Sequence, residues 1–189
     1  MKYLIILFLM FTLALPLKSQ THYIPSTPEM SNDWRAGFFG CTDLDYGFGL
    51  KDVSIPYSKY FYGVTAMGGY QFNRVVKAGF GLGISRFDSG NLYPLFMHFR
   101  YSIWAQKWVP FIYADGGYMF DFSDVIEGSR FFANPGIGVH YVAKERLAVN
   151  FSAGLFHHAG GSGGRSSFIN FKLGLEFKGR ARNNFVIIE

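Results

Sequence analysis

The chain has 189 residues, of which 49% are hydrophobic, 20% aromatic and only 16% charged. Soluble domains carry about 25% charged residues, so this chain has less charge than most of them. The aromatic and glycine content argues against disorder, and the single cysteine excludes a disulfide framework and a multi-thiolate metal site. The length suits one domain with a sizeable core.

Residues 1–19 have the layout of a secretory signal peptide. Lys2 gives a basic start, residues 3–15 form an apolar run, and Pro16 interrupts it before the small residue Ser19. The run is shorter than the roughly 20 apolar residues of a membrane-spanning helix, which favours a cleaved signal over the alternative, an uncleaved signal anchor. We therefore predict cleavage near Ser19, and no cysteine follows that would indicate a lipoprotein.

Removal of the signal peptide also removes two lysines, so the formal net charge falls from +5 to +3. The other basic residues are scattered along the chain, apart from a short basic run at 179–182. Nucleic-acid binding proteins concentrate their positive charge in patches or stripes. We therefore expect no nucleic-acid partner.

Seven stretches after the signal peptide alternate between apolar residues and polar or small ones, and an eighth does so weakly. In 59–72, for example, the even positions are apolar or glycine, whereas the odd ones include Lys59, Thr65 and Gln71. Alternate side chains of a strand point to opposite faces, so each stretch predicts a strand with one apolar face. The expected strands are 34–39 (the weak one), 59–72, 76–85, 93–103, 108–121, 131–141, 147–155 and 169–177.

The alternation favours a membrane barrel over the alternative, a soluble β-sandwich. The apolar faces extend over about 9–11 residues, the length of a tilted membrane strand, whereas soluble strands average about five or six. Aromatic residues such as Tyr60, Trp108 and Tyr141 gather near strand ends, as they do in the girdles at membrane interfaces. We therefore predict an all-β fold, an eight-stranded antiparallel transmembrane up-and-down β-barrel, over residues 33–178.

The connections between the expected strands predict the orientation of this barrel. The tight ones are 73–74, 105–107 and 143–146, and the longer ones are 42–58, 86–91, 123–129 and 157–167. Outer-membrane barrels have short periplasmic turns and longer external loops. An even number of strands brings both termini to one side. We therefore predict a periplasmic N-terminal segment, 20–32, and a periplasmic C-terminal tail, 179–189.

In this pattern the sequence resembles the small eight-stranded outer-membrane barrels of the OmpA/OmpX type, within the porin family. Residues 172–177, Lys-Leu-Gly-Leu-Glu-Phe, are similar to the C-terminal signal that the barrel-assembly machinery reads. The resemblance implies an integral, multi-pass protein of the bacterial outer membrane, surrounded by lipid and lipopolysaccharide. The tail 179–189 departs from the family, whose chains usually stop at the aromatic residue. Because of this additional tail, we consider the two termini as candidates for contacts with other envelope proteins.

The inward-facing positions predict a filled lumen. Eight strands enclose a space about wide enough for side chains alone, and a mixture of glycines and bulky aromatics packs such a space solid. Because an isolated buried charge is costly, we expect the inward charges to form a paired network. These charges are Arg35, Lys77, Arg100, Lys172, Asp115, Asp121 and Glu176.

The alternation of inward and outward positions on two neighbouring strands predicts one group within this network. It places His98 or Arg100 next to Asp115, with Arg100 opposite Phe111 or Tyr113. We interpret the group as a structural ion-pair plug. The alternative is a proton or ion path, which perturbed buried groups can also form.

The sequence Phe-His-His-Ala-Gly-Gly-Ser-Gly-Gly around His157 and His158 resembles the outer-membrane lipid A deacylases. The nucleophile of those enzymes follows the histidine by two positions, where this chain has Gly160 after His158. Ser162 is displaced, and Glu176 lies too far along its strand toward the periplasm. A base must reach its nucleophile at hydrogen-bond distance, so we predict a Gly/Ser loop with histidines at the rim and no catalytic residues.

We expect no metal or cofactor site. The histidine pair lacks a supporting carboxylate or cysteine, and the glycine-rich stretches lack the Lys-Ser/Thr ending of a phosphate loop. Cys41 has no partner and is expected to be a buried small hydrophobe. The predicted function is that of a non-enzymatic outer-membrane barrel with a structural or partner-binding role, for example as an accessory subunit of an envelope complex. The alternatives are a lipid A deacylase-like hydrolase and a narrow channel.

Overall fold

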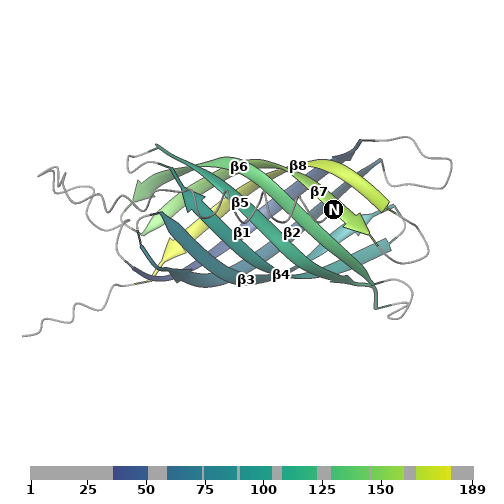
Figure 1. The fold of residues 1–189 in the computed structure, drawn as a ribbon, viewed down its shortest axis with the longest axis horizontal. Helices are drawn as coiled ribbons and strands as arrows, with labels where there is room; N and C mark the ends of the chain where they lie inside the picture. Colours follow the sequence, from purple (N-terminus) through teal and green to yellow (C-terminus); the bar gives the residue numbers. More distant parts are fainter. Residues whose placement is uncertain are drawn as a thin grey trace, which may run out of the picture.

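The structure, a computed structural model, is a closed barrel of eight antiparallel strands, each paired with its neighbours in the sequence, with β8 completing the circle against β1 (Figure 1). It describes residues 36–50, 59–73, 75–88, 90–103, 108–122, 129–144, 146–159 and 165–179. The strands are β1 (Gly37–Gly49), β2 (Tyr60–Gln71), β3 (Val76–Phe87), β4 (Gly90–Ser102), β5 (Trp108–Phe120), β6 (Arg130–Lys144), β7 (Leu147–Ala159) and β8 (Arg165–Lys178). No helix among these residues is long and apolar enough to cross a membrane. The predicted fold class is confirmed.

The two ends of the barrel differ in what they contain. The turn end, on the left in Figure 1, holds the β2–β3, β4–β5 and β6–β7 connections, the beginning of β1 and the end of β8. The loop end holds the other four connections. At the turn end the Gly179 N–H donates a hydrogen bond to the Phe38 carbonyl, at 2.8 Å. The first and last described parts of the chain therefore lie side by side.

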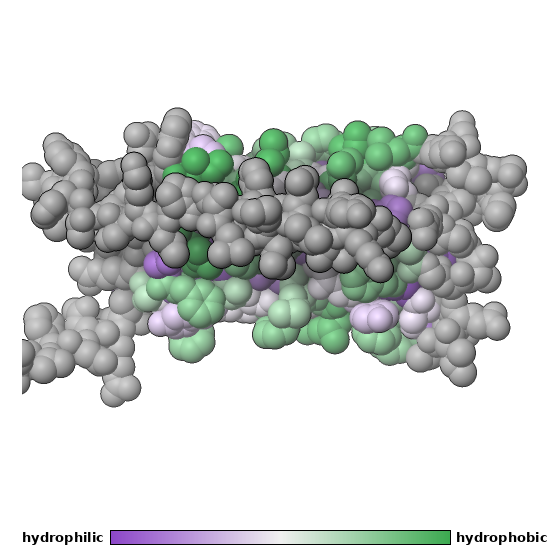
Figure 2. Space-filling view, in the orientation of Figure 1, coloured by the Kyte–Doolittle hydropathy of each residue, from purple (hydrophilic) through white to green (hydrophobic). Residues whose placement is uncertain are grey.

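The polarity of the barrel is the reverse of that of a soluble protein. On β4, the outward side chains of Met97 and Phe99 are 63% and 48% exposed, whereas the inward side chains of His98 and Arg100 are 4% and 3% exposed. The same alternation holds along the other strands, and hydrophobic side chains gather on the outer wall in Figure 2. The predicted assignment of apolar faces to the outside is confirmed.

The first strand is longer than the sequence analysis predicted. Residues 42–58 were expected to form a loop, but β1 continues to Gly49. Asp43 and Asp45 face the lumen, where both are buried, and Asp45 has Lys172 as an ionic partner. The outward positions between and after them are apolar: Leu44, Tyr46 and Phe48. The prediction was wrong because polar residues in this stretch line a charged lumen instead of forming a solvent-exposed loop.

The connection 86–91 was predicted to be a longer loop, and it is a tight turn instead. β3 ends at Phe87, which pairs directly with Gly90 at the start of β4. Gly90 has a φ of 141°, a backbone conformation that glycine adopts without a steric cost. It allows the chain to reverse between two directly paired residues.

The segment 157–167 was also predicted to be a loop, and most of it belongs to strands. β7 continues to Ala159 and β8 begins at Arg165. The long connections of the loop end are therefore those between β1 and β2 and between β5 and β6. Residues 1–19, 20–32 and 180–189 lie outside the described residues, as do Arg35, Gly160 and Ser162.

Candidate functional site: the filled lumen

Aromatic side chains close the loop end of the lumen. Phe61 is the centre of this group, with its ring centroid 5.1 Å from that of Phe87, 5.0 Å from Phe156 and 5.2 Å from Phe168. Aromatic rings at such separations attract one another by about 0.5–1.5 kcal/mol per pair beyond the burial of their surface. We call the group the aromatic plug; its members are Phe61, Phe87, Phe96, Phe132, Phe156 and Phe168.

Glycines on neighbouring strands make room for these rings. Gly47 on β1 lies opposite Phe61 on β2, and Gly81 on β3 lies opposite Phe96 on β4. A Cβ atom at either glycine would collide with the facing ring. The alternation of small and large inward residues predicted from the sequence therefore works through direct cross-strand pairs.

Lys172 on β8 lies at the centre of the first of two buried charge clusters. Its Nζ is 2.8 Å from Asp115 Oδ2 and 3.5 Å from Asp45 Oδ1. Asp115 Oδ1 is 2.6 Å from His98 Nδ1, and Thr65 Oγ1 donates a hydrogen bond to Asp45 Oδ2 at 2.9 Å. These five residues form the Lys172 cluster, in which both carboxylates share a single ammonium group.

Glu176 on β8 lies at the centre of the second cluster, nearer the turn end. Its Oε1 forms an ion pair with Lys77 Nζ, and its Oε2 lies 2.8 Å from Arg100 Nη1 and 3.7 Å from His140 Nδ1. Asn150 Nδ2 donates to Oε2 at 3.3 Å. These five residues form the Glu176 cluster. The carboxylate has partners from β3, β4, β6 and β7, so the cluster joins five of the eight strands, including β4 on the wall opposite β8.

Strand parity correctly predicted which residues face one another on β4 and β5. His98 lies directly opposite Asp115, and Arg100 lies opposite Tyr113. The ion partner of Arg100 is nevertheless Glu176, from the far side of the barrel. Parity specifies the face of a side chain but not which partner it reaches across the lumen.

Cys41 is buried as predicted, but it belongs to the polar interior rather than acting only as a small hydrophobe. Its Sγ donates a hydrogen bond to Asp43 Oδ1 at 3.1 Å and accepts one from Asn150 Nδ2 at 3.4 Å. Asp43 and Asp45 are lumen residues that fall within the predicted loop 42–58. Their spacing at every second position, with apolar residues between, is the signal that could have identified them.

The spaces left beside the clusters are small. A cavity of about 20 Å³ lies between the aromatic plug and Lys172, and another of about 10 Å³ lies between Lys172 and Arg100. About 10–15 Å³ of such volume is needed to hold one water molecule. Each space is therefore no larger than one or two waters, and the side chains of the two clusters fill the section of the lumen where they lie.

The structure separates the two rim histidines. His158 faces inward, is buried and stacks on Phe168 with ring centroids 5.8 Å apart. His157 faces outward, and its Nδ1 lies 2.7 Å from Ser167 Oγ on β8. The pair was not predicted from the sequence, because both residues fall within the expected loop 157–167.

This His–Ser pair lacks the third member of a hydrolytic triad among the described residues. Within them, the hydrogen-bond partner of the His157 ring is Ser167, whereas an activated serine needs a base that a further group orients. Glu176 is at the opposite end of β8 and is paired with Lys77 and Arg100. In the same part of the chain, no group of three or more His, Cys, Asp or Glu side chains could hold a metal ion.

A closed antiparallel barrel of eight strands, apolar outside and ion-paired inside, has the architecture of the small outer-membrane barrels. The fold is similar to that of Neisserial surface protein A (NspA), with a TM-score of 0.57, 14% identity, and coverage of 77% of this chain and 99% of that one. It is also similar to the outer membrane protein OprG of Pseudomonas aeruginosa, with a TM-score of 0.52, 10% identity, and coverage of 78% and 98%.

The N-terminal β-barrel domain of Pseudomonas aeruginosa OprF aligns with a TM-score of 0.49 at 15% identity, over 76% of this chain and 100% of that domain. No protein-family model and no curated protein matches the sequence. The similarities to NspA and OprG confirm the predicted fold, which they share with this chain at low sequence identity.

Proposed function

We propose that the chain is a non-enzymatic integral protein of the bacterial outer membrane, with a structural or partner-binding role. The observation that carries this proposal is the reversed polarity of the barrel. Soluble monomers rarely expose apolar patches larger than a few hundred Å², whereas here every strand presents large apolar side chains outward. A bilayer is the solvent in which such a surface is stable, and a closed barrel leaves no strand edge unpaired within it.

The filled lumen favours a structural role over transport. The Lys172 and Glu176 clusters fix side chains from opposite strands in the middle of the lumen, and the aromatic plug closes its loop end. Burying these charges is tolerated because they are paired and hydrogen-bonded. A narrow channel would need a continuous path through this section.

We further propose that the periplasm lies at the turn end and that the two chain termini together form the contact with another envelope protein. The hydrogen bond between Gly179 and Phe38 brings the described ends of the chain to one place, and 20–32 and 179–189 are the segments next to these ends in the sequence. A single partner can therefore contact both. Lipid and lipopolysaccharide surround the barrel in this proposal, and the barrel-assembly machinery is its partner during insertion.

Deletion of residues 180–189 tests the partner role. The shortened chain should still enter the outer-membrane fraction and migrate as a folded barrel that heating unfolds, but it should lose proteins that co-purify with the full chain in mild detergent. Unchanged co-purification rejects the partner role. A full chain found in the soluble fraction rejects the membrane location itself.

The outward pair of His157 and Ser167 is the one observation that favours the competing function, a lipid-modifying hydrolase. It lies at the loop end of the outer wall, beside the apolar band. Mass spectrometry of lipid A from cells with and without the protein distinguishes the two functions. We expect identical lipid A in both, and identical lipid A with the variant Ser167→Ala; a lipid A species that depends on Ser167 would establish the hydrolase.

A further inference from the structure

A β-bulge at the turn end of β6 changes the side of the barrel to which Lys144 belongs. His140 is buried in the lumen, so the even-numbered positions of β6 point inward. Regular alternation would therefore point Lys144 into the lumen as well. The register of β6 and β7 shifts, however, so that Val142 lies opposite Ala148 and Lys144 lies opposite Leu147. Bulges commonly redirect a side chain in this way. Lys144 therefore shares the outward side of Leu147.

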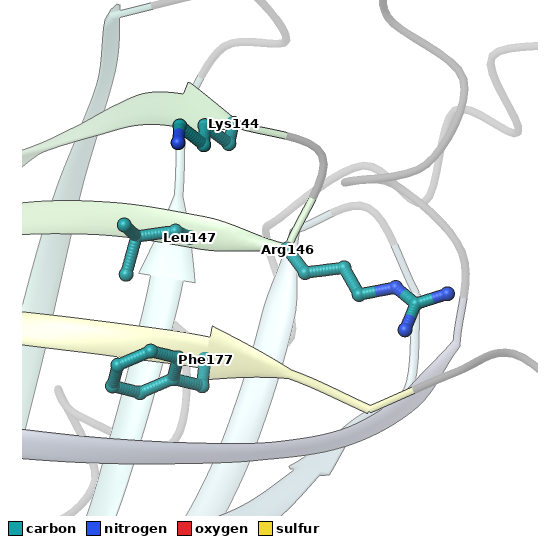
Figure 3. A pocket seen from close by; sticks show the side chains of 4 residues that line it. All are labelled: Lys144, Arg146, Leu147 and Phe177. Atoms are coloured by element: carbon teal, nitrogen blue, oxygen red, sulfur yellow. The ribbon is translucent and has the colours of Figure 1, made fainter.

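Lys144 is the first member of a row across three neighbouring strands. It lies opposite Leu147 on β7, which in turn lies opposite Phe177 on β8. Phe177 is 57% exposed on the outer wall. Figure 3 shows the three side chains one above the other, with Arg146 extending past the strand ends. Together these four residues line a shallow groove of about 590 Å³.

The turn that carries Arg146 is tied to β8. The Arg146 carbonyl accepts a hydrogen bond from the Lys178 N–H at 3.0 Å, directly beside Phe177. The groove therefore has a fixed apolar floor, Leu147 and Phe177, that continues the outer wall of the barrel. In Figure 3 the Lys144 amine lies over this wall, whereas the Arg146 guanidinium lies beyond the strand ends.

Basic residues are concentrated in the two stretches of sequence that border the groove. The charged residues in the sequence at the β6–β7 turn and from the end of β8 to 182 are Lys144, Glu145, Arg146, Lys178, Arg180 and Arg182, of which Glu145, Arg180 and Arg182 lie outside the described residues. These two stretches of sequence contain five basic residues and one acidic residue. Arginine and lysine together are typical of sites that recognise phosphate groups. Basic residues next to the hydrocarbon boundary also attract anionic lipids.

We propose that this groove binds an anionic glycerophospholipid, with Lys144 and Arg146 on opposite sides of its headgroup and an acyl chain along Leu147 and Phe177. The inference rests on the proposed function, because it requires the barrel to span a bilayer. In the proposed orientation the turn end reaches the periplasmic leaflet, where glycerophospholipids rather than lipopolysaccharide are found. The redirected Lys144 is what turns an ordinary strand end into a headgroup site.

Native mass spectrometry of the folded full chain in detergent micelles tests the proposal, with phosphatidylglycerol and phosphatidylcholine of matched acyl chains as the probes. The wild type should bind phosphatidylglycerol more tightly than phosphatidylcholine. The variant K144Q/R146Q should bind phosphatidylglycerol about 25-fold more weakly, since each cation near a membrane surface contributes about fivefold in affinity. The control K59Q/R86Q removes two exposed cations at the loop end and should bind like the wild type.

Three results would overturn the proposal: equal affinity of the wild type for both lipids, unchanged binding of phosphatidylglycerol by K144Q/R146Q, or an equal loss in K59Q/R86Q. If the double variant does not migrate as a folded barrel, K144Q and R146Q are measured singly, each with an expected loss of about fivefold. If the wild type inserts into membranes but does not prefer phosphatidylglycerol, the lipid site is rejected and the proposed function is not. A wild type that does not enter membranes rejects the proposed function.

Discussion

Arg100 on β4 and Glu176 on β8 meet in the lumen with Nη1 and Oε2 2.8 Å apart, although three strands separate them in either direction around the barrel. β4 and β8 are therefore opposite walls of the barrel, and this ion pair extends across its full width. Glu176 also binds Lys77 of β3. One carboxylate thus cross-links strands that no backbone hydrogen bond joins.

The variant Glu176→Gln should be strongly destabilised. It leaves Lys77 and Arg100 as buried cations without their carboxylate, and breaking a buried pair in this way costs about 3–5 kcal/mol. Urea unfolding of the barrel in detergent micelles or vesicles measures the free energy of unfolding. Lys59→Gln, at an exposed position, should change it by less than about 0.5 kcal/mol. A loss below about 1 kcal/mol in Glu176→Gln would show that the cluster contributes little to stability.

Gly47→Ala should destabilise the barrel because its Cβ would collide with the ring of Phe61. Overpacking of this kind costs about 1–3 kcal/mol. Gly40→Ala is a matched control on the same strand, where the nearest atom to the added Cβ is 3.9 Å away. The double variant Gly47→Ala/Phe61→Leu should recover part of the loss, measured as a coupling energy between the two sites. Equal effects of Gly47→Ala and Gly40→Ala would contradict the small-against-large packing of the lumen.

Planar bilayers containing the purified wild type should show no conductance above the baseline. The Lys172 and Glu176 clusters occupy the middle of the lumen, and the cavities beside them hold at most one or two waters each. Phe61→Ala/Phe168→Ala removes two rings of the aromatic plug and leaves both clusters in place, so it should also stay at the baseline. Steady, ion-selective current through the wild type would establish the channel alternative.

Much of the fold follows from the sequence because the barrel has a strict period of two. Met97 and His98 differ so sharply in polarity that the side each one faces is predictable from the alternation alone. Asp43 and Asp45 obey the same alternation, but two acids close together in the sequence are also typical of an exposed loop. Only their lumen partners, such as Lys172, distinguish the two cases.

The sites depend on relations that the alternation does not contain. The meeting of Arg100 with Glu176 depends on the tilt and stagger of strands on opposite walls, which set how far along the barrel each side chain lies. The outward position of Lys144 depends on a bulge that reverses its parity. The pair of His157 and Ser167 depends on how far β7 extends before the chain turns. Each of these is a property of register rather than of residue type.

The accessibility of spin labels in vesicles shows whether the barrel spans a membrane with its apolar face in lipid. Labels replace Met97 and Leu82, two exposed residues of the outer wall, and Lys59 at the loop end, in a variant without Cys41. Labels at Met97 and Leu82 should collide readily with oxygen, which dissolves in lipid, and hardly at all with a water-soluble nickel chelate, whereas the label at Lys59 should collide with the chelate. Free access of the nickel chelate to the labels at Met97 and Leu82 would show that the outer wall does not lie in lipid.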